Sequence, residues 1–214
     1  MATVAVIDYG MGNLHSIAKA LKTASADSDV IVSADKDTIL SADRVVFPGV
    51  GAIRDCMNAL RSTGLDDTIK QVAKDKPLLG ICIGMQALLQ HSEENDGIDC
   101  LGILPGNVVR FPKGLKDSQN NKLKIPHMGW NEVIKCKQSP LFNNIDNNER
   151  FYFVHSYFAD NVGKGIATAI SKYPSEFPCA LQFKNIVAVQ FHPEKSQHAG
   201  LQLLTNFLNW DGRS

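Results

Sequence analysis

The chain has 214 residues, of which 44% are hydrophobic and 21% are charged, and its 22 basic and 22 acidic side chains cancel to a formal net charge of zero. This length and composition are typical of a globular protein with a sizeable core, and they exclude disordered, collagen-like and low-complexity classes. The neutral balance argues against a nucleic-acid partner and against a polybasic membrane anchor, and the sequence has neither a signal peptide nor an apolar run of the ~20 residues that span a membrane.

The first half of the chain predicts alternating strands and helices. Short apolar runs bounded by glycine, proline, asparagine and aspartate indicate strands, and apolar residues at positions i, i+3, i+4 and i+7 after Asn13 indicate a helix that Asn13 caps. The predicted strands are 3–7, 29–32, 44–47 and 78–81, and the further helices are 56–61, 68–74 and 84–91. This alternation predicts a mainly parallel central sheet flanked by helices on both faces.

The second half is rich in strand-like segments. Lys184 and Asn185 separate two of them by only two residues, which predicts a hairpin turn, and apolar residues on one face predict a final helix over 198–209. The predicted strands are 108–111, 131–134, 151–154, 166–170, 180–183 and 186–191. We therefore expect one α/β domain over residues 1–214, with an added antiparallel β portion in the C-terminal half.

Segment 110–124 carries five basic residues and one acidic residue. A solvated surface loop is the favoured interpretation, and contact with a partner or a phosphate group is the alternative.

The five cysteines form no Cys-x-x-Cys pair, and the chain is long enough to fold without disulfides. We interpret them as reduced thiols of a cytoplasmic protein. The sequence has no histidine, cysteine and carboxylate cluster with metal-ligand spacing and no phosphate-binding loop, so we expect neither a metal nor a cofactor.

Cys82 lies between Gly80 and Gly84, where a predicted strand meets a predicted helix. This is the pattern of a nucleophile elbow, in which a tight turn presents the nucleophile at a helix N-terminus. The helix dipole there favours a thiolate, and the backbone N–H of Ile83 can stabilise an oxyanion. We interpret Cys82 as a nucleophile, with a small buried core thiol as the alternative, and the other four cysteines as structural.

A cysteine nucleophile needs a base and a group that orients the base. His192 ends an apolar strand, and Glu194 points the same way because residues two apart on an extended segment share a face. A carboxylate on one imidazole nitrogen leaves the other nitrogen to face the thiol. The alternative is a surface histidine near an unrelated glutamate. His155 has no carboxylate two residues away, so we expect it in a pocket wall.

Gly49 and Gly51 follow the predicted strand 44–47. Glycines let backbone N–H groups turn and approach a substrate closely, so this segment is a candidate for the second oxyanion donor. An ordinary turn at a strand end is the alternative.

These motifs resemble those of the class I (triad-type) glutamine amidotransferases, which hydrolyse the side-chain amide of glutamine and release ammonia. The resemblance rests on the Gly-Ile-Cys-Ile-Gly-Met-Gln segment at 80–86 and on His-Pro-Glu at 192–194. Within that family, segments 8–13, 48–51, 126–131, 155–157 and 190–196 are similar to the glutaminase subunits of imidazole glycerol phosphate synthases, from histidine biosynthesis. Ile83 stands where the family often has leucine, which should matter little because the donor there is backbone.

The resemblance implies a flavodoxin-like class I amidotransferase fold and a specific set of site residues. The catalytic triad would be Cys82, His192 and Glu194, and the oxyanion hole would use the N–H groups of Val50 and Ile83. The glutamine contacts would come from Gly49, Gly51, Gln86, Glu94, His155, Ser156 and Tyr157.

The resemblance also implies a partner. A separate (β/α)₈-barrel cyclase subunit would form a heterodimer with this chain and receive ammonia through a channel. The matching interface positions are Asn13, Trp130 and Lys195, although Trp130 could instead be packed in the core. The resemblance further implies that the glycine-rich segment reorients before its N–H points inward.

Three other functions stay open at this point. The chain could be a paralogous amidotransferase that supplies ammonia to a synthase of surface sugars. It could be a Cys-His-Glu peptidase or another amide hydrolase. It could also be a non-catalytic binding subunit, although the intact Cys82, His192 and Glu194 argue against this.

Overall fold

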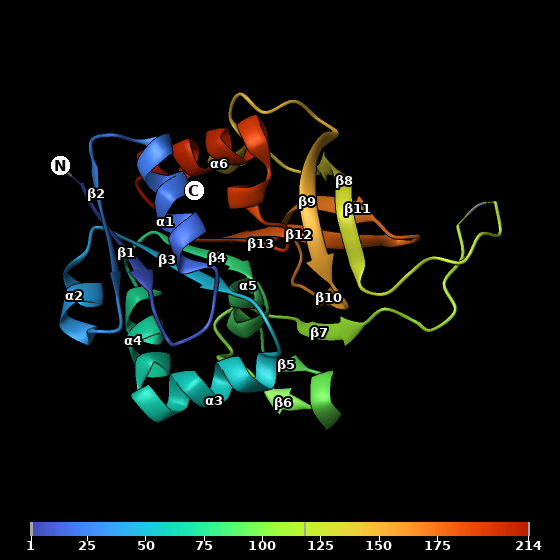
Figure 1. Ribbon diagram of the computed structural model, residues 1–214, viewed down its shortest axis with the longest axis horizontal. Helices are drawn as coiled ribbons and strands as arrows, with labels where there is room; N and C mark the ends of the chain where they lie inside the picture. The colour runs from blue at the N-terminus through green and yellow to red at the C-terminus, as the bar shows by residue number, and fades with distance from the viewer. Residues whose placement is uncertain (1, 118, 214) are drawn as a thin grey trace.

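A large mixed sheet runs through the computed structural model, which describes residues 2–117 and 119–213 (Figure 1). Its strands in spatial order are β2 (Ser28–Ser33), β1 (Ala2–Ile7), β3 (Arg44–Gly49), β4 (Leu78–Cys82), β13 (Ile186–Val189), β12 (Glu176–Phe183), β11 (Ala167–Lys172), β8 (His127–Lys135) and β9 (Glu149–His155). In this order, each pairing from β2 to β13 is parallel, and each pairing from β13 to β9 is antiparallel. The predicted antiparallel portion therefore continues the parallel sheet.

A second, smaller sheet lies against the large sheet where β10 (Tyr157–Asp160) contacts β12. Its strands in spatial order are β10, β7 (Asn107–Arg110), β5 (His91–Ser92) and β6 (Ile98–Asp99). The prediction included only β7 of these four. Two of the others are two residues long, which is too short to show a hydrophobic period.

Helices cover both faces of the large sheet, as predicted (Figure 1). On one face α1 (Leu14–Ala24) packs against α6 (Gln197–Asn209), and the buried residues of α1 are Ile17, Ala20 and Leu21. The opposite face carries α2 (Lys36–Ser41), α3 (Ile53–Thr63), α4 (Leu65–Val72) and α5 (Ile83–Leu88). The described residues also form three single-turn 3₁₀ helices, η1 (Glu94–Asp96), η2 (Pro140–Phe142) and η3 (Pro193–Lys195). No helix in the described ranges is long and apolar enough to cross a membrane.

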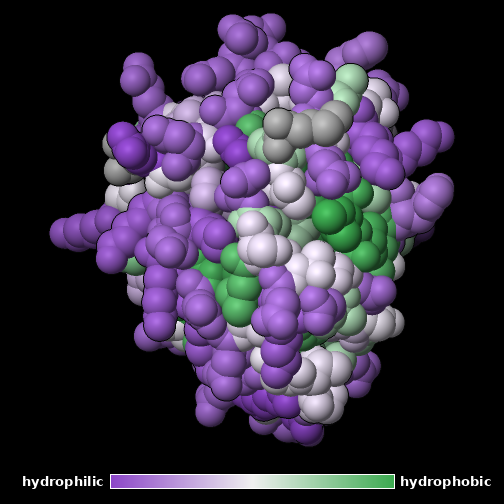
Figure 2. Space-filling model, turned by 90° about the vertical axis from the view of Figure 1, so that its left-hand side faces the viewer, coloured by the Kyte–Doolittle hydropathy of each residue, from purple (hydrophilic) through white to green (hydrophobic). Residues whose placement is uncertain are grey.

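The central strands explain the position of the core. All residues of β4 and β13 are buried, because both strands lie inside the sheet with helices on each face. At the edge, only Val30 of β2 is buried, whereas Asp29 and Val32 are exposed. Figure 2 views this side of the molecule and shows separate hydrophobic areas among hydrophilic side chains.

Two helix predictions need correction. Asn13 stands at the N-cap position of α1, but its side chain makes no capping hydrogen bond. The predicted helix 84–91 ends at Leu88, because Leu89 is extended and His91 enters β5, where its Nδ1 lies 2.9 Å from Oδ1 of Asp99.

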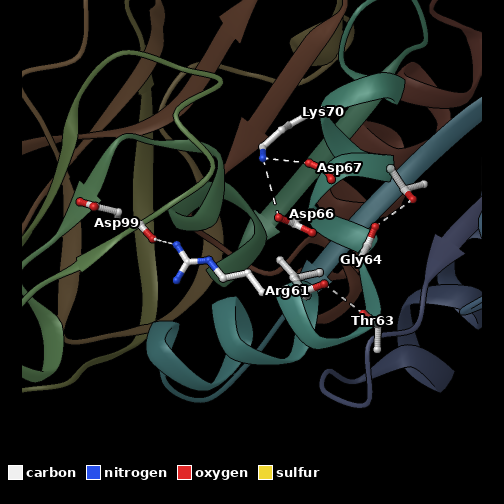
Figure 3. A network of polar contacts seen from close by, with 9 residues as sticks. Arg61, Thr63, Gly64, Asp66, Asp67, Lys70 and Asp99 are labelled. Atoms are coloured by element: carbon white, nitrogen blue, oxygen red, sulfur yellow. Dashed lines mark hydrogen bonds and ion pairs between the residues drawn. The ribbon is translucent and has the colours of Figure 1, made fainter.

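The α3–α4 corner fixes the helices near the small sheet (Figure 3). Gly64 has φ +68°, a conformation that favours glycine, and it ends α3 and precedes α4. The Arg61 guanidinium donates to the carbonyl of Asp99 at 2.7 Å, which ties α3 to β6. Lys70 pairs with Asp66 and Asp67 on the surface, where such pairs contribute only ~0–1 kcal/mol.

The predicted helix 68–74 ends at Val72 in α4, and the predicted strand 186–191 ends at Val189 in β13. Two other predicted features are found in the structure. Lys184 and Asn185 form the two-residue turn between β12 and β13, with Lys184 at φ +52°. Segment 110–124 runs out from β7 as an extended surface excursion before β8 (Figure 1), and Ser118 within it lies outside the described residues. This agrees with a solvated loop.

Candidate active site

Cys82 is the last residue of β4 and immediately precedes α5. Its backbone has φ 54° and ψ −108°, a region that residues with a Cβ rarely adopt. Strained backbone conformations of this kind are concentrated at functional sites, where the surrounding structure maintains them. The sequence pattern therefore folds locally into the strained strand-to-helix turn of a nucleophile elbow.

The two glycines around Cys82 are required by close packing. A Cβ built on Gly84 would lie 1.9 Å from the carbonyl oxygen of Phe47 in β3. A Cβ on Gly80 would lie 2.8 Å from a methyl carbon of Leu88 and 3.1 Å from the backbone nitrogen of Met85. Any larger residue at Gly84 would push β3 and α5 apart.

His192 and Glu194 form a buried pair beside the nucleophile. Nδ1 of His192 lies 2.8 Å from Oε1 of Glu194, and the two side chains are 2% and 4% exposed. Burial by itself lowers the pKa of His192, but the Cys82 sulfur and the Glu194 carboxylate together raise that pKa above its ordinary value. Nε2 of His192 is buried without a hydrogen-bond partner among the described residues, so it is free to exchange a proton in the cavity.

A cavity of about 520 Å³ opens over the sulfur. Most residues of the predicted site meet at its wall, although they come from distant parts of the chain. The wall consists of Asn13, Val50, Gly51, Cys82, Ile83, Gln86, Glu94, Pro126, Val154, His155, Ser156, Tyr157, His192 and Lys195. Three predicted residues do not line it: Gly49, Glu194 and Trp130.

The predicted oxyanion donors lie on the two segments that flank the sulfur. Ile83 is the first residue of α5, so its N–H has no carbonyl partner within the helix. Val50 follows β3, whose last residue Gly49 pairs with Cys82 in the sheet. Gly51 next to it has φ +94° and requires glycine for that reason.

Gly49 itself is buried behind the cavity wall. A Cβ at this position would lie 2.6 Å from the hydroxyl of Tyr9 and 2.8 Å from Cβ of Ile83. Its role is therefore to let β3 approach the elbow, and it offers no side chain to a ligand.

Glu94 and His155 are predicted ligand contacts that already have partners within the chain. Glu94 accepts a hydrogen bond at 2.8 Å from the N–H of Ile53, the first residue of α3. His155 uses both ring nitrogens, one with Nδ1 of His127 at 2.9 Å and one with the carbonyl of Tyr157 at 2.8 Å. The position of His155 in the wall agrees with the prediction of a pocket residue rather than a base.

A further buried amide reaches the nucleophile. Nε2 of Gln190 lies 3.7 Å from Sγ of Cys82, and Gln190 is fully buried. The prediction assigned Gln190 no role. The sequence feature that could have indicated a role is its position two residues before His192. On an extended segment, residues two apart place their side chains on the same side.

The predicted interface residues lie around the cavity mouth and beyond it. Asn13 and Lys195 line the cavity, and the Lys195 ammonium lies 5.6 Å from the centre of the Tyr152 ring. Trp130 packs edge-on against the same ring and is 42% exposed. The alternative in which Trp130 is a core residue is therefore wrong.

The other cysteines have no comparable setting. All five are free thiols, as predicted. Burial raises the pKa of Cys56 and of Cys100 to about 12, and burial also holds the pKa of Cys179 well above its ordinary value. Cys136 is exposed on β8's C-terminal side, away from the cavity lining. Within 2–117 and 119–213 no group of three or more histidine, cysteine or carboxylate side chains could hold a metal.

The sequence matches known proteins over its whole length. A family model described as "Glutamine amidotransferase class-I" matches residues 5–210. The chain is 56% identical over 214 residues to the imidazole glycerol phosphate synthase subunit HisH of Pseudomonas putida, covering 100% of both chains. It is 53% identical over 209 residues to the subunit of the same name from Thiobacillus denitrificans, covering 97% of this chain and 91% of that one.

Solved structures share the fold at low sequence identity. One described as a glutamine amidotransferase has a TM-score of 0.72 at 18% identity and covers 96% of both chains. A glutamine amidotransferase from Thermotoga maritima has a TM-score of 0.63 at 15% identity, covering 100% of this chain and 99% of that one. These likenesses show the fold alone, and it is the fold expected from the sequence.

Proposed function

The chain belongs to the class I glutamine amidotransferase family, and on that premise we propose that it is the glutaminase subunit of an imidazole glycerol phosphate synthase. Its substrate is glutamine, and its products are glutamate and ammonia. The observation that supports this most strongly is that the strained Cys82 and His192 line one cavity, with His192 held by the buried Glu194. Full-length relatives with more than half of their residues identical carry the same subunit name.

The geometry suits acyl transfer to a thiolate. The Cys82 sulfur attacks the γ-carboxamide carbon of glutamine, and N–H groups at Ile83 and Val50 stabilise the oxyanion. Nε2 of His192 then protonates the leaving nitrogen, so that ammonia departs and a γ-glutamyl thioester remains. His192 next removes a proton from water, which attacks the thioester and releases glutamate. Glu194 stays ionised and holds Nδ1 of His192 at 2.8 Å.

Val50 is the less constrained of the two oxyanion donors. Ile83 is part of the elbow, whereas Val50 lies between two glycines, and Gly51 has φ +94°. We propose that a reorientation of this segment brings the Val50 N–H into the cavity. Such a step would make the hydrolysis rate depend on whatever contacts the segment.

The ammonia requires an acceptor, which we propose to be a separate (β/α)₈-barrel cyclase subunit in a heterodimer. Asn13 and Lys195 at the cavity wall and Trp130 on the exposed surface form the proposed contact. We also propose that residues 1–214 act as one glutaminase domain, because the large sheet joins strands from both halves of the chain. A cytoplasmic location fits a thiolate nucleophile, which oxidising surroundings would inactivate.

The test is a glutaminase assay of the purified chain, with and without a cyclase subunit and the cyclase's nucleotide ligand. We expect weak activity alone and strong activity with the liganded cyclase. Equal activity in both conditions would contradict the coupling to a cyclase and would favour a stand-alone hydrolase or the sugar-pathway paralogue. No activity in any condition would contradict the catalytic assignment itself.

Replacement of Glu194 with glutamine tests the orienting role of the carboxylate. The amide keeps the size of the side chain but removes the charge that stabilises the protonated imidazole, so kcat should fall by about 100-fold or more. KM should change little, because Glu194 does not line the cavity. A Glu194→Gln enzyme with wild-type kcat would show that His192 needs no carboxylate partner.

A further inference from the structure

Gln190 connects the nucleophile to a second buried amide. Its Nε2 lies 3.7 Å from the Cys82 sulfur, and its Oε1 accepts a hydrogen bond from Nε2 of Gln86 at 3.0 Å. Gln86 also donates to the carbonyl oxygen of Tyr157 at 3.1 Å. Gln190 and Gln86 are 0% and 2% exposed, so solvent offers these amides no alternative partner.

The direction of each amide is determined by the Tyr157 carbonyl. A carbonyl oxygen can only accept, so Gln86 must present its NH₂ group to it, and the same NH₂ group faces Gln190. Gln190 must therefore turn its oxygen toward Gln86. Its NH₂ group is then left to donate to the Cys82 sulfur.

A pair of buried histidines also contacts the carbonyl of Tyr157. Nδ1 of His155 donates to the Tyr157 oxygen at 2.8 Å, which leaves Nε2 of His155 as an acceptor for Nδ1 of His127 at 2.9 Å. Nε2 of His127 then accepts from the side-chain amide of Asn131 at 3.2 Å. That amide also donates to the carbonyl of Lys172 at 2.9 Å. Every donor in this series of hydrogen bonds therefore meets an acceptor, and one consistent set of tautomers allows this.

The surroundings keep both histidines neutral, as these tautomers require. Burial lowers the pKa of His127 to about 4 and that of His155 to about 3. The ring of His127 is also stacked with Phe153 and Tyr173, at centroid distances of 5.0 and 4.1 Å. Packing therefore fixes the plane of the ring, and the hydrogen bonds fix the positions of its nitrogens.

We propose that Gln190 is a positioning residue that holds the Cys82 sulfur through its side-chain N–H, and that His127, His155 and Asn131 keep this donor correctly oriented. An N–H donor stabilises the sulfur as a thiolate and restricts its rotation toward His192. The inference deepens the proposed function, because it names groups outside the triad that set the state of the nucleophile.

The test compares Cys82 alkylation by iodoacetamide with glutamine turnover. For Gln190→Met, which keeps length and removes the donor, we expect Cys82 alkylation and kcat to fall about 10-fold, with KM changed less than about 3-fold. Gln190→Glu serves as a second variant, because it keeps the acceptor facing Gln86 and places a negative charge at the sulfur. Its Cys82 should alkylate still more slowly. If both folded variants react like the wild type, the proposal is overturned.

His127 provides a matched pair of variants that test the rest of this series of hydrogen bonds. His127→Phe keeps the stacking and removes both nitrogens, and we expect alkylation of Cys82 to slow about 3-fold. His127→Asn replaces the Nδ1 donor with an amide N–H and should recover most of the wild-type rate. Equal rates in the two variants, whether both normal or both slow, would overturn the role of the histidines. Because alkylation requires no glutamine, these results stand apart from failure of the glutaminase assignment.

Discussion

Replacement of Cys82 with alanine is expected to lower the glutaminase rate about 10⁴-fold or more, because no other group can form the thioester. The alanine keeps the Cβ atom and the backbone conformation at φ 54°, so the fold should be preserved. Steady-state ammonia release with the liganded cyclase measures the loss, and circular dichroism checks the fold.

Cys136→Ala is the matched control for this variant. Cys136 is exposed and does not line the cavity, so its thiol should contribute nothing to turnover. A Cys82→Ala enzyme with more than a few per cent of wild-type activity would contradict covalent catalysis at this residue. A similar loss in Cys136→Ala would indicate a general effect of thiol removal.

Gly84→Ala is expected to be the most destabilising single-methyl change at the site. The added Cβ would lie 1.9 Å from the carbonyl oxygen of Phe47, which is backbone and cannot rotate away. Either β3 or α5 must shift, and overpacking of this kind costs about 3 kcal/mol or more. Because the shift moves the elbow, activity should be lost even where the protein folds. Urea unfolding measures the stability, and ammonia release measures the activity.

Gly102→Ala separates this clash from a general glycine effect. A Cβ at Gly102 would meet nothing within 4 Å, but its φ of +66° strains any other residue. We expect a loss of about 1 kcal/mol from the backbone alone, with full activity. If Gly84→Ala were no less stable than Gly102→Ala, the close approach of β3 to α5 would not restrain the elbow.

The parts of the fold that could be predicted are those with strong local patterns. The apolar runs at 78–81 and 186–191 indicate buried strands, and both lie at the centre of the sheet as β4 and β13. The Gly-x-Cys-x-Gly pattern identified the elbow because it is local in sequence. In contrast, β5 and β6 are two residues each and exist only through their pairing, so no periodicity could reveal them.

The candidate site shows a similar division. Glu194 could be placed beside His192 because the two are close in sequence. The orientation of Gln190 depends on Gln86, which is 104 residues away, and His127 meets His155 across 28 residues. A pattern among neighbouring residues cannot predict contacts between residues so far apart in the sequence.

Asn13 shows how a local rule can fail at a proposed site. Its residue type and position predict a helix cap, yet its side chain makes no capping bond and lines the cavity. Departures from local preference are expected where a residue serves a site. The unused cap therefore supports the proposed functional role of Asn13.

Covalent labelling can show whether Cys82 attacks the side-chain amide of glutamine. A glutamine analogue with a diazoketone in place of the amide should alkylate the nucleophile with loss of N₂, and peptide mass spectrometry then locates the adduct. We expect one adduct, on Cys82, that forms more slowly when glutamine is in excess. An adduct on another cysteine, or labelling of Cys82 that glutamine does not slow, would contradict such an attack.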